Sequence, residues 1–233
     1  MNYAAVTAKI CAMSANLLTS QDYEIIQTIE SAREVTAWLQ AKPNYIQTAE
    51  ESAARICRYI PDKINRNFLM QMAEVNMGNI QYYTSQWKRL KQLDKANSVV
   101  IRGILGVEID LNNILWMYRL KRYHRLKGDA TYGYLIPIRY KLSQAITQRM
   151  AECKTPKELL DEIEKSPYSG ELSKLKPTKG SRLTPEQSLL KIIERRYELV
   201  ARRYPNTLIP ALSYIHKKKL ELNKLMSITE SLQ

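Results

Sequence analysis

Apolar residues recur at helical spacing through the middle of the chain. The residues that follow one another at steps of three or four positions are Val100, Ile104, Val107, Leu111, Ile114 and Tyr118. This spacing places them on one side of a helix. The pattern continues without interruption from about Asn97 to Lys127, so we predict a single long helix there.

Capping and breaking residues divide the rest of the chain into further helices. A capping Ser or Thr is followed three residues later by Glu or Gln at 31–34, 48–51, 155–158 and 184–187, and Pro follows the cap in the last two segments. Such signals begin helices. Gly or Pro indicates loops at 128–137, 169–182 and 204–207. No segment alternates as a strand does, so we predict an all-α fold.

Polar residues interrupt the long helix at Glu108, Asp110, Asn112 and Asn113. One interpretation is that they line a hydrated edge of the helix. The other is that Asn112 forms a hydrogen bond to a neighbouring helix and fixes its register, because a buried amide without a partner is costly.

A similar segment near the end of the chain favours the second interpretation. Residues 220–226 align without gaps on 109–115, which places Glu221 on Asp110 and repeats an Asn two residues later. An acidic residue, a Leu, an Asn and two aliphatic residues recur in the same order. Chance similarity between two amphipathic helices is the alternative explanation.

A second similarity lies outside these helices. Residues 155–159 resemble 31–35, and Tyr168 then falls near Tyr45 with a slip of one residue. Recurrence in the same order is typical of an internally repeated helical protein. The two predicted modules are residues 1–125 and 126–233.

The composition adds a strong positive charge. The 233 residues contain 36 Lys and Arg against 23 Asp and Glu, a net charge of +13. This charge favours binding to nucleic acid, anionic lipid or an acidic protein surface, without choosing among them. The start does not resemble a signal peptide, and no apolar stretch approaches the length of a membrane span. Three widely spaced Cys residues are expected to be free, mostly buried thiols in a reducing cytoplasm.

Known catalytic motifs are absent from the sequence. It contains no phosphate-binding Gly-rich loop, no Gly-x-Ser-x-Gly and no His-Glu-x-x-His. Glu108 and Asp110 point in different directions on a helix, which does not suit shared acid–base work. His124 and His216 lie beside basic residues and are interpreted as solvated. We therefore expect no catalytic, cofactor-binding or metal-binding residues, and no small-molecule substrate.

The polar segment of the long helix, residues 108–121, is followed by a Tyr-rich loop and by Leu135-Ile136-Pro137. This arrangement resembles the rotary ATPase subunit that is named C in prokaryotic A-type and d in eukaryotic V-type complexes. Both ends of the chain are also similar to that family. The residues that carry the resemblance as a structural motif are Glu108, Asp110, Asn112, Asn113, Arg119, Glu221 and Asn223.

The resemblance implies a non-catalytic subunit built from repeated helical modules arranged as a funnel. Such a subunit lies on the cytoplasmic side of the membrane, peripheral to it. It couples the central shaft to the membrane rotor ring during proton or sodium transport. The chain is about a third shorter than the three-module members of the family, and only two modules are traced, so we expect a partial funnel.

The expected partners of such a subunit are the shaft subunits and the rotor ring, with membrane contact only through the ring. The loops at 128–137 and 169–182 and the turn at 204–207 are the expected attachment points, because loops on helical scaffolds are exposed. Tyr132, Tyr134 and Tyr168 would supply aromatic contact area there.

Two other functions are compatible with the sequence. Basic residues cluster with Tyr between residues 118 and 127 and between 195 and 204, which suits a helical nucleic-acid-binding protein. No known nucleic-acid-binding module accompanies them, and Lys and Arg at helix C-termini also interact favourably with the helix dipole. A helical scaffold unrelated to rotary ATPases is the third possibility.

Overall fold

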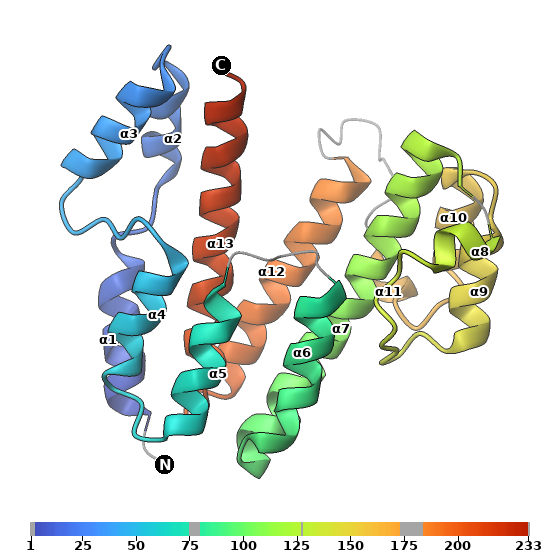
Figure 1. Ribbon diagram of the computed structural model, residues 1–233, viewed down its shortest axis with the longest axis horizontal. Coiled ribbons are helices and arrows are strands. Elements are labelled where there is room, and N and C mark those ends of the chain that lie inside the picture. The colour runs from blue at the N-terminus through green and yellow to red at the C-terminus, as the bar shows by residue number, and fades with distance from the viewer. Residues whose placement is uncertain (1–2, 75–79, 127, 173–183, 233) are drawn as a thin grey trace. The chain divides into compact units, whose positions relative to one another are not determined.

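The computed structural model describes residues 3–74, 80–126, 128–172 and 184–232, and every regular element within them is helical (Figure 1). The predicted all-α fold is confirmed. The helices up to the middle of the chain are α1 (Ala4–Ser14), α2 (Ser20–Gln27), α3 (Ala32–Ala41), α4 (Ala49–Cys57), α5 (Lys63–Ala73), α6 (Ile80–Arg89) and α7 (Lys95–Arg119). Those that follow are α8 (Gly128–Tyr132), α9 (Gln144–Glu152), α10 (Pro156–Ile163), α11 (Ser169–Leu172), α12 (Pro185–Arg203) and α13 (Ile209–Glu230).

The long central helix forms close to where it was predicted. α7 spans 25 residues and continues into a π-helical turn at Leu120–His124, shortly before the predicted end at Lys127. All residues of the predicted apolar stripe are buried except Val100, which is half-buried. Burial also extends to Ile101 and Leu105, so α7 is covered on more than one side.

Capping side chains begin several helices as predicted. Thr48, Thr155 and Thr184 each accept a hydrogen bond from the backbone N–H three residues later, at 3.0, 3.1 and 3.2 Å. Ser31 instead accepts from the N–H of Arg33 at 3.3 Å rather than from Glu34. These local bonds satisfy N–H groups that the first helical turn leaves without partners.

One compact unit comprises Met1–Val75, Gln92–Asn97 and Tyr197–Gln233. α13 is its central helix, and α1, α4 and α5 pack against it (Figure 1). α3 also contacts α13, where Ile26, Val35 and Leu225 form a small core. Residues from both ends of the chain therefore build one core.

The other compact unit comprises Asn76–Lys91 and Ser98–Arg196. Within it, α8 and α10 both pack on α9. Tyr140 lies against Gly106 of α7 so closely that a Cβ at this glycine would be 2.4 Å from the Tyr140 ring. The absence of a side chain at Gly106 therefore allows the segment before α9 to reach α7.

The compact units are interleaved along the chain, whereas the predicted modules at 1–125 and 126–233 are consecutive. α7 and α12 each contribute residues to both units, so neither compact unit is one continuous segment of the sequence. The division into two consecutive modules, which rests on the similarity between two parts of the sequence, stays a prediction.

The predicted loops are only partly irregular. The loop expected at 128–137 begins with α8, whose first residue, Gly128, has a φ of 51° that favours glycine. The loop expected at 169–182 begins with α11, and its residues from 173 onward lie outside the described part of the chain. The turn expected at 204–207 connects α12 to α13.

Candidate functional site

Asp110 is the centre of a buried hydrogen-bond cluster on α7. Its carboxylate accepts from the backbone N–H groups of Tyr140, Lys141 and Leu142 at 3.2, 2.7 and 3.1 Å. It also accepts from the hydroxyl of Tyr168 at 2.7 Å. Asp110 is 1% exposed. Because these donors belong to the segment before α9 and the segment after α10, one side chain holds both segments against α7.

A second cluster connects α6 to α7. The hydroxyl of Tyr83 donates to Glu108 at 3.0 Å, and the amide of Asn112 donates to the Tyr83 oxygen at 2.9 Å. Burial raises the pKa of Tyr83, and the nearby Glu108 raises it further. Asn112 therefore bonds to a neighbouring helix, as the second interpretation of the sequence expects, and it is half-buried.

Asn113 connects α7 to the segment after α8. Its side-chain amide donates to the carbonyl of Ile136 at 3.1 Å, and its amide oxygen accepts from the N–H of Ile136 at 2.8 Å. Both residues are buried. A buried polar side chain with both ends satisfied specifies the position of its partner segment.

Glu221 is the centre of a corresponding cluster on α13. Its carboxylate accepts from the N–H of Leu18 at 2.6 Å, the hydroxyl of Tyr45 at 2.9 Å and the ammonium of Lys218 at 2.5 Å. Lys218 also lies over the Tyr45 ring, 3.8 Å from its centroid. Burial lowers the pKa of Lys218, and burial together with Glu221 raises that of Tyr45.

The two carboxylate clusters share a pattern of partners. Asp110 and Glu221 each lie on a long helix and accept from one Tyr hydroxyl and from the backbone, three N–H groups for Asp110 and that of Leu18 for Glu221. Their tyrosines, Tyr168 and Tyr45, are the pair that the sequence similarity placed together. Asn223 differs from Asn112 because it is exposed. The equivalence of the two halves stays a prediction.

Sequence reasoning missed two members of these clusters, Tyr83 and Lys218. Tyr83 lies on a different helix from its partners, so no local spacing identified it. Lys218 precedes Glu221 by three residues on the same helix, a spacing at which side chains meet. That spacing could have identified the pair.

The three tyrosines expected to contact partners have different positions. Tyr134 is 58% exposed, and Tyr132 is half-buried with its hydroxyl against the guanidinium of Arg139. Tyr168 is fully buried against Asp110. Tyr168 therefore offers no surface to a partner, which confines the proposed aromatic contacts to Tyr132 and Tyr134.

The basic segment at the end of α7 divides into an inward and an outward part. Lys121 is 2% exposed and donates to the carbonyls of Ala151 and Cys153 at 2.8 and 2.7 Å. It thereby satisfies carbonyl groups at the C-terminus of α9, although burial lowers its pKa. Arg122 and Arg125 are exposed. The segment is therefore less of a continuous basic surface than its sequence indicates.

Arg119, the remaining motif residue of α7, lies on the surface. Its side chain is half-exposed, and its Nε lies 3.3 Å from a carboxylate oxygen of Glu186 on α12. An exposed ion pair of this kind contributes little to stability.

Two expectations about reactive residues are wrong. His216 is buried and stacked on Tyr197 with ring centroids 4.4 Å apart, because α13 turns this position into the core. His124 is exposed as expected. The three cysteines are free thiols, but Cys11 is exposed and the other two are half-buried.

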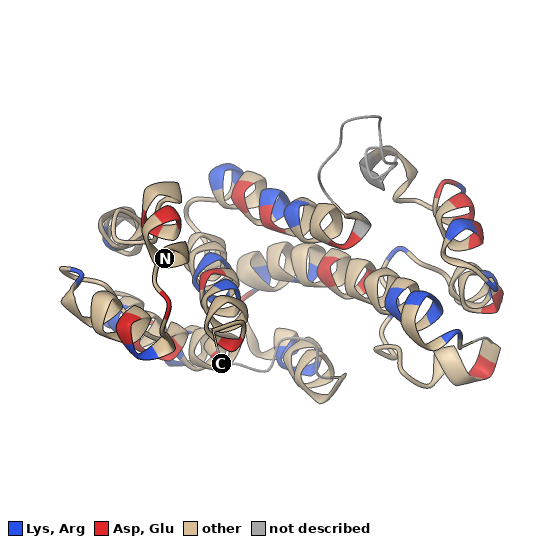
Figure 2. Cartoon of the chain, turned by 90° about the horizontal axis from the view of Figure 1, so that it is seen from above, with Lys and Arg blue, Asp and Glu red and all other residues tan. Residues whose placement is uncertain are grey.

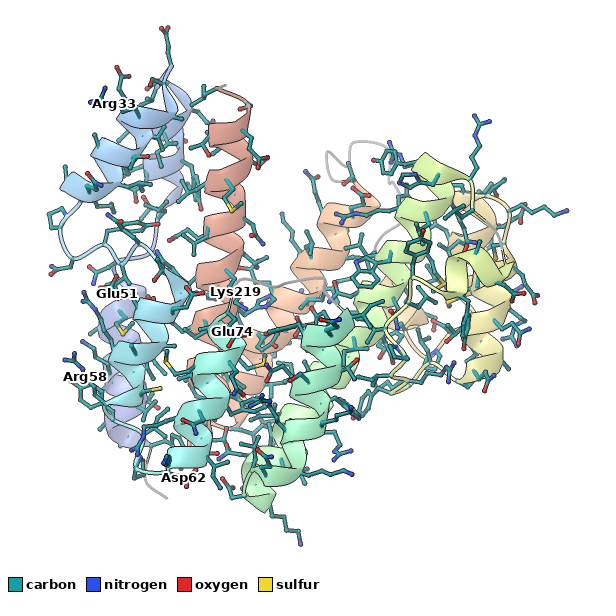
Figure 3. All side chains as sticks on the ribbon, viewed as in Figure 1. Arg33, Glu51, Arg58, Asp62, Glu74 and Lys219 are labelled. Carbon is teal, nitrogen blue, oxygen red and sulfur yellow. The ribbon has the colours of Figure 1, made fainter. Side chains whose placement is uncertain are left out.

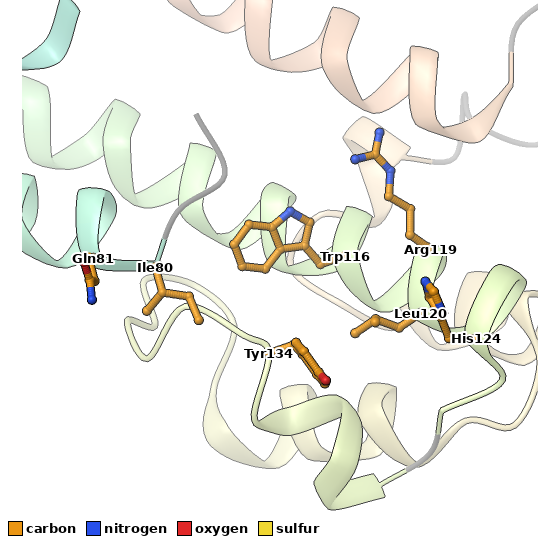
Figure 4. Close-up of a pocket in the computed structure, with 7 residues that line it drawn as sticks. All are labelled: Ile80, Gln81, Trp116, Arg119, Leu120, His124 and Tyr134. Carbon is orange, nitrogen blue, oxygen red and sulfur yellow. The ribbon is translucent and has the colours of Figure 1, made fainter. Parts of the chain in front are cut away.

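An apolar groove lies beside the C-terminal end of α7. Its volume is about 650 Å³, and its apolar lining consists of Ile80, Trp116, Leu120 and Tyr134. Figure 4 shows the Trp116 ring facing the space between Ile80 and Tyr134, with His124 beside Leu120. In Figure 4 the Arg119 side chain points away from Ile80 and Tyr134, and its Nε forms the ion pair with Glu186. The groove can hold apolar side chains.

Residues of both signs occur together on some helices, such as α12, whereas α5 and α6 carry Lys and Arg without Asp or Glu (Figure 2). The net charge of +13 is the excess of 36 Lys and Arg over 23 Asp and Glu. Among the described residues, no helix combines the length and the apolar character that crossing a membrane requires.

These features define a helical scaffold in which buried polar side chains hold helices and loops in register. The chain belongs to the ATP synthase (C/AC39) subunit family, whose model matches residues 75–233. Members of that family are accessory subunits of V/A-type rotary ATPases.

A curated relative is the C subunit of the A-type ATP synthase of Pyrococcus furiosus, which is 26% identical over 165 residues. The match covers 67% of this chain and 44% of the relative, so the chain spans less than half of that protein's length. No solved structure matches the chain significantly.

Proposed function

We propose that this chain is a non-catalytic central-rotor subunit of a V/A-type ATPase. In this function it couples the central shaft to the membrane rotor ring while ions are transported, and it lies peripherally on the cytoplasmic side of the membrane. The observation that carries the proposal is the family match over residues 75–233. We also propose that the two modules of the chain form a partial funnel.

The buried clusters support a mechanical role. A subunit that transmits torque must keep its helices in register under load, and buried hydrogen-bonded carboxylates oppose sliding because each donor left without an acceptor is costly. Asp110 and Glu221 both have this arrangement. The carboxylates are thus occupied by structural bonds and serve the scaffold rather than a reaction.

The groove and the aromatic surface beside it support a role in binding. Tyr134 is exposed next to the groove, and Tyr132 lies close by in the sequence. Aromatic residues and Arg are enriched where proteins bind one another. We assign contacts with the shaft or the ring to this region.

Reconstitution tests the proposed function. The purified chain is mixed with recombinant shaft subunits and detergent-solubilised rotor ring from the same genome, and complexes are separated by size-exclusion chromatography at physiological salt. We expect a stable complex with at least one of them and no ATP hydrolysis by the chain alone. Failure to bind both partners, or ATPase activity that scales with purified chain, would contradict the proposal.

A further inference from the structure

We propose that the pocket between α1, the end of α12 and α13 binds a small organic acid, which has one carboxylate group and an apolar body. This inference goes beyond the proposed function and does not depend on it. The pocket lies wholly within the unit that contains both ends of the chain, and its volume is about 470 Å³. Sites for small molecules typically enclose about 300–1,000 Å³.

Each of the three helices builds one wall of the pocket. The wall residues of α1 begin at Thr7, those of α12 at Glu198 and those of α13 at Pro210. In each series they continue three, four and seven positions further on, a spacing that shares one face of a helix, and the α12 series ends with Pro205 just after the helix. The Thr7 hydroxyl donates to the carbonyl of Pro205 at 3.4 Å, which joins two of these walls. Many of the wall side chains are small, so the space between the helices stays open.

The apolar part of the lining selects the body of the ligand. Ile10, Pro205 and Pro210 are apolar members of the lining, and Tyr214 adds an aromatic residue. Covering apolar surface is favourable because it removes that surface from water. The ligand should therefore consist mainly of carbon atoms, as a short chain or a ring does.

The charges of the lining select the carboxylate. Lys217 of α13 and Glu198 of α12 form an ion pair at 2.5 Å, so their charges balance. Arg202 also lines the pocket, and among the described residues it forms no ion pair. One positive charge is thus left over, which suits an acid with one negative charge better than a phosphate monoester with nearly two. The planar guanidinium of Arg can donate two parallel hydrogen bonds to a carboxylate.

A buried hydroxyl in the lining favours the same ligand. Ser213 is 6% exposed and lines the pocket, and no hydrogen bond joins its hydroxyl to another described residue. A buried polar group without a partner is costly. An oxygen of the bound acid would accept a hydrogen bond from this hydroxyl.

Binding to the full chain tests this inference, with phenylbutyrate as the probe. The controls are its neutral amide, acetate, which lacks the apolar body, and phenylbutyl phosphate, which carries more negative charge. Affinity is measured by isothermal titration calorimetry. We expect the acid to bind about tenfold more tightly than each control, or better.

The thiol of Cys11 reports where the acid binds, because Cys11 is exposed and lines the pocket. A bound acid should slow the alkylation of Cys11 by iodoacetamide, which mass spectrometry measures. Cys57 and Cys153 are half-buried and lie outside the lining, so their alkylation rates should change little and serve as internal controls.

Paired variants separate the charge from the apolar wall. Arg202→Gln removes the unpaired charge and should weaken binding about tenfold or more. Ala201→Leu keeps that charge but fills part of the pocket, and it should weaken binding to a similar extent. The matched controls are Arg58→Gln, which changes an exposed arginine at the end of α4 (Figure 3), and Ala8→Leu, which changes an exposed position of α1 outside the lining. Neither control should change affinity.

Several results would overturn the inference. They are equal binding of the acid and its amide, equal binding by wild type and Arg202→Gln, tighter binding of the phosphate than of the acid, or binding that leaves the alkylation of Cys11 unchanged. Circular dichroism shows whether each variant keeps its helical content, and Ala201→Leu tests the pocket independently of Arg202. Because the probes include no shaft or ring subunit, complex formation with those subunits decides the proposed function separately.

Discussion

Single buried carboxylates hold distant segments of this chain together. Asp110 binds donors that lie about thirty to sixty residues further on, and Glu221 binds donors from the first fifth of the sequence. A buried acceptor with several donors is costly to remove because every donor then lacks a partner. Stability at the residue scale should therefore depend strongly on these two positions.

The Asp110 cluster gives the first prediction. Asp110→Ala should lower the free energy of unfolding by about 3 kcal/mol or more, because three backbone N–H groups and the Tyr168 hydroxyl lose their acceptor. Urea denaturation followed by circular dichroism measures the change. The control is Asp129→Ala, which removes an exposed carboxylate of the same unit and should change stability by less than about 0.5 kcal/mol. Equal losses in both variants would disprove the role of Asp110.

The buried pair of Lys218 and Glu221 gives the second prediction. Lys218→Met and Glu221→Gln should each cost about 3–5 kcal/mol, because each leaves a buried partner uncompensated. The double variant should cost clearly less than the sum, since both charges are then gone. A double-mutant cycle in urea measures this coupling, and additive losses would show that the two side chains act independently.

At the scale of elements, close contact between α7 and its neighbours depends on glycine. Gly106 lies under the Tyr140 ring, and the N–H of Tyr140 donates to Asp110 one turn further along α7. The glycine and the carboxylate therefore position the same segment, one by leaving space and the other by accepting hydrogen bonds.

A pair of glycine substitutions tests this arrangement. Gly106→Ala should destabilise the protein by about 1–3 kcal/mol, because the new Cβ would overlap the Tyr140 ring. Gly103→Ala is the matched control on the same helix, where the nearest atom to a new Cβ would be 3.8 Å away. Since Ala favours helix over Gly, that control should be neutral or stabilising by up to about 1 kcal/mol. Similar denaturation midpoints for the two variants would refute the proposed close packing.

For the whole molecule, buried and half-buried tyrosines of both compact units link stability to alkaline pH. Burial raises the pKa of Tyr3 and Tyr45 in one unit and of Tyr83 in the other. Above about pH 10 the unfolded chain loses Tyr protons that the folded chain keeps. The folded state then binds more protons, so its stability falls as the pH rises.

Alkaline titration checks this prediction. We expect tyrosinate absorbance from the buried residues to appear together with loss of the helical circular dichroism signal. Tyr45→Phe should flatten the fall in stability above about pH 10, whereas Tyr59→Phe, which changes an exposed tyrosine, should not. Burial lowers the pKa of Lys121 and of Lys218. Between this lowered pKa and the pKa of Lys in the unfolded chain, the unfolded chain binds more protons, so stability from these two residues increases as the pH rises. A stability curve that stays level above pH 10 would contradict the assignment of buried tyrosines.

The sequence by itself determined the features that depend on neighbouring residues. Helical periodicity and capping signals predicted the all-α class, the central helix and most helix starts, because these arise from side-chain spacing and from bonds within one turn. The polar motif around Asp110 also stood out, since carboxylates and amides are unusual in an apolar stripe.

Only the tertiary structure decided which of these residues meet. Tyr83 contacts Glu108 from another helix, and Leu18 and Tyr45 contact Glu221 from the opposite end of the chain. Each compact unit combines segments that are separated in the sequence. The groove likewise combines α6, the end of α7 and the segment after α8. The physical reason is that burial and long-range hydrogen bonds depend on how helices pack, which periodicity along one helix does not encode.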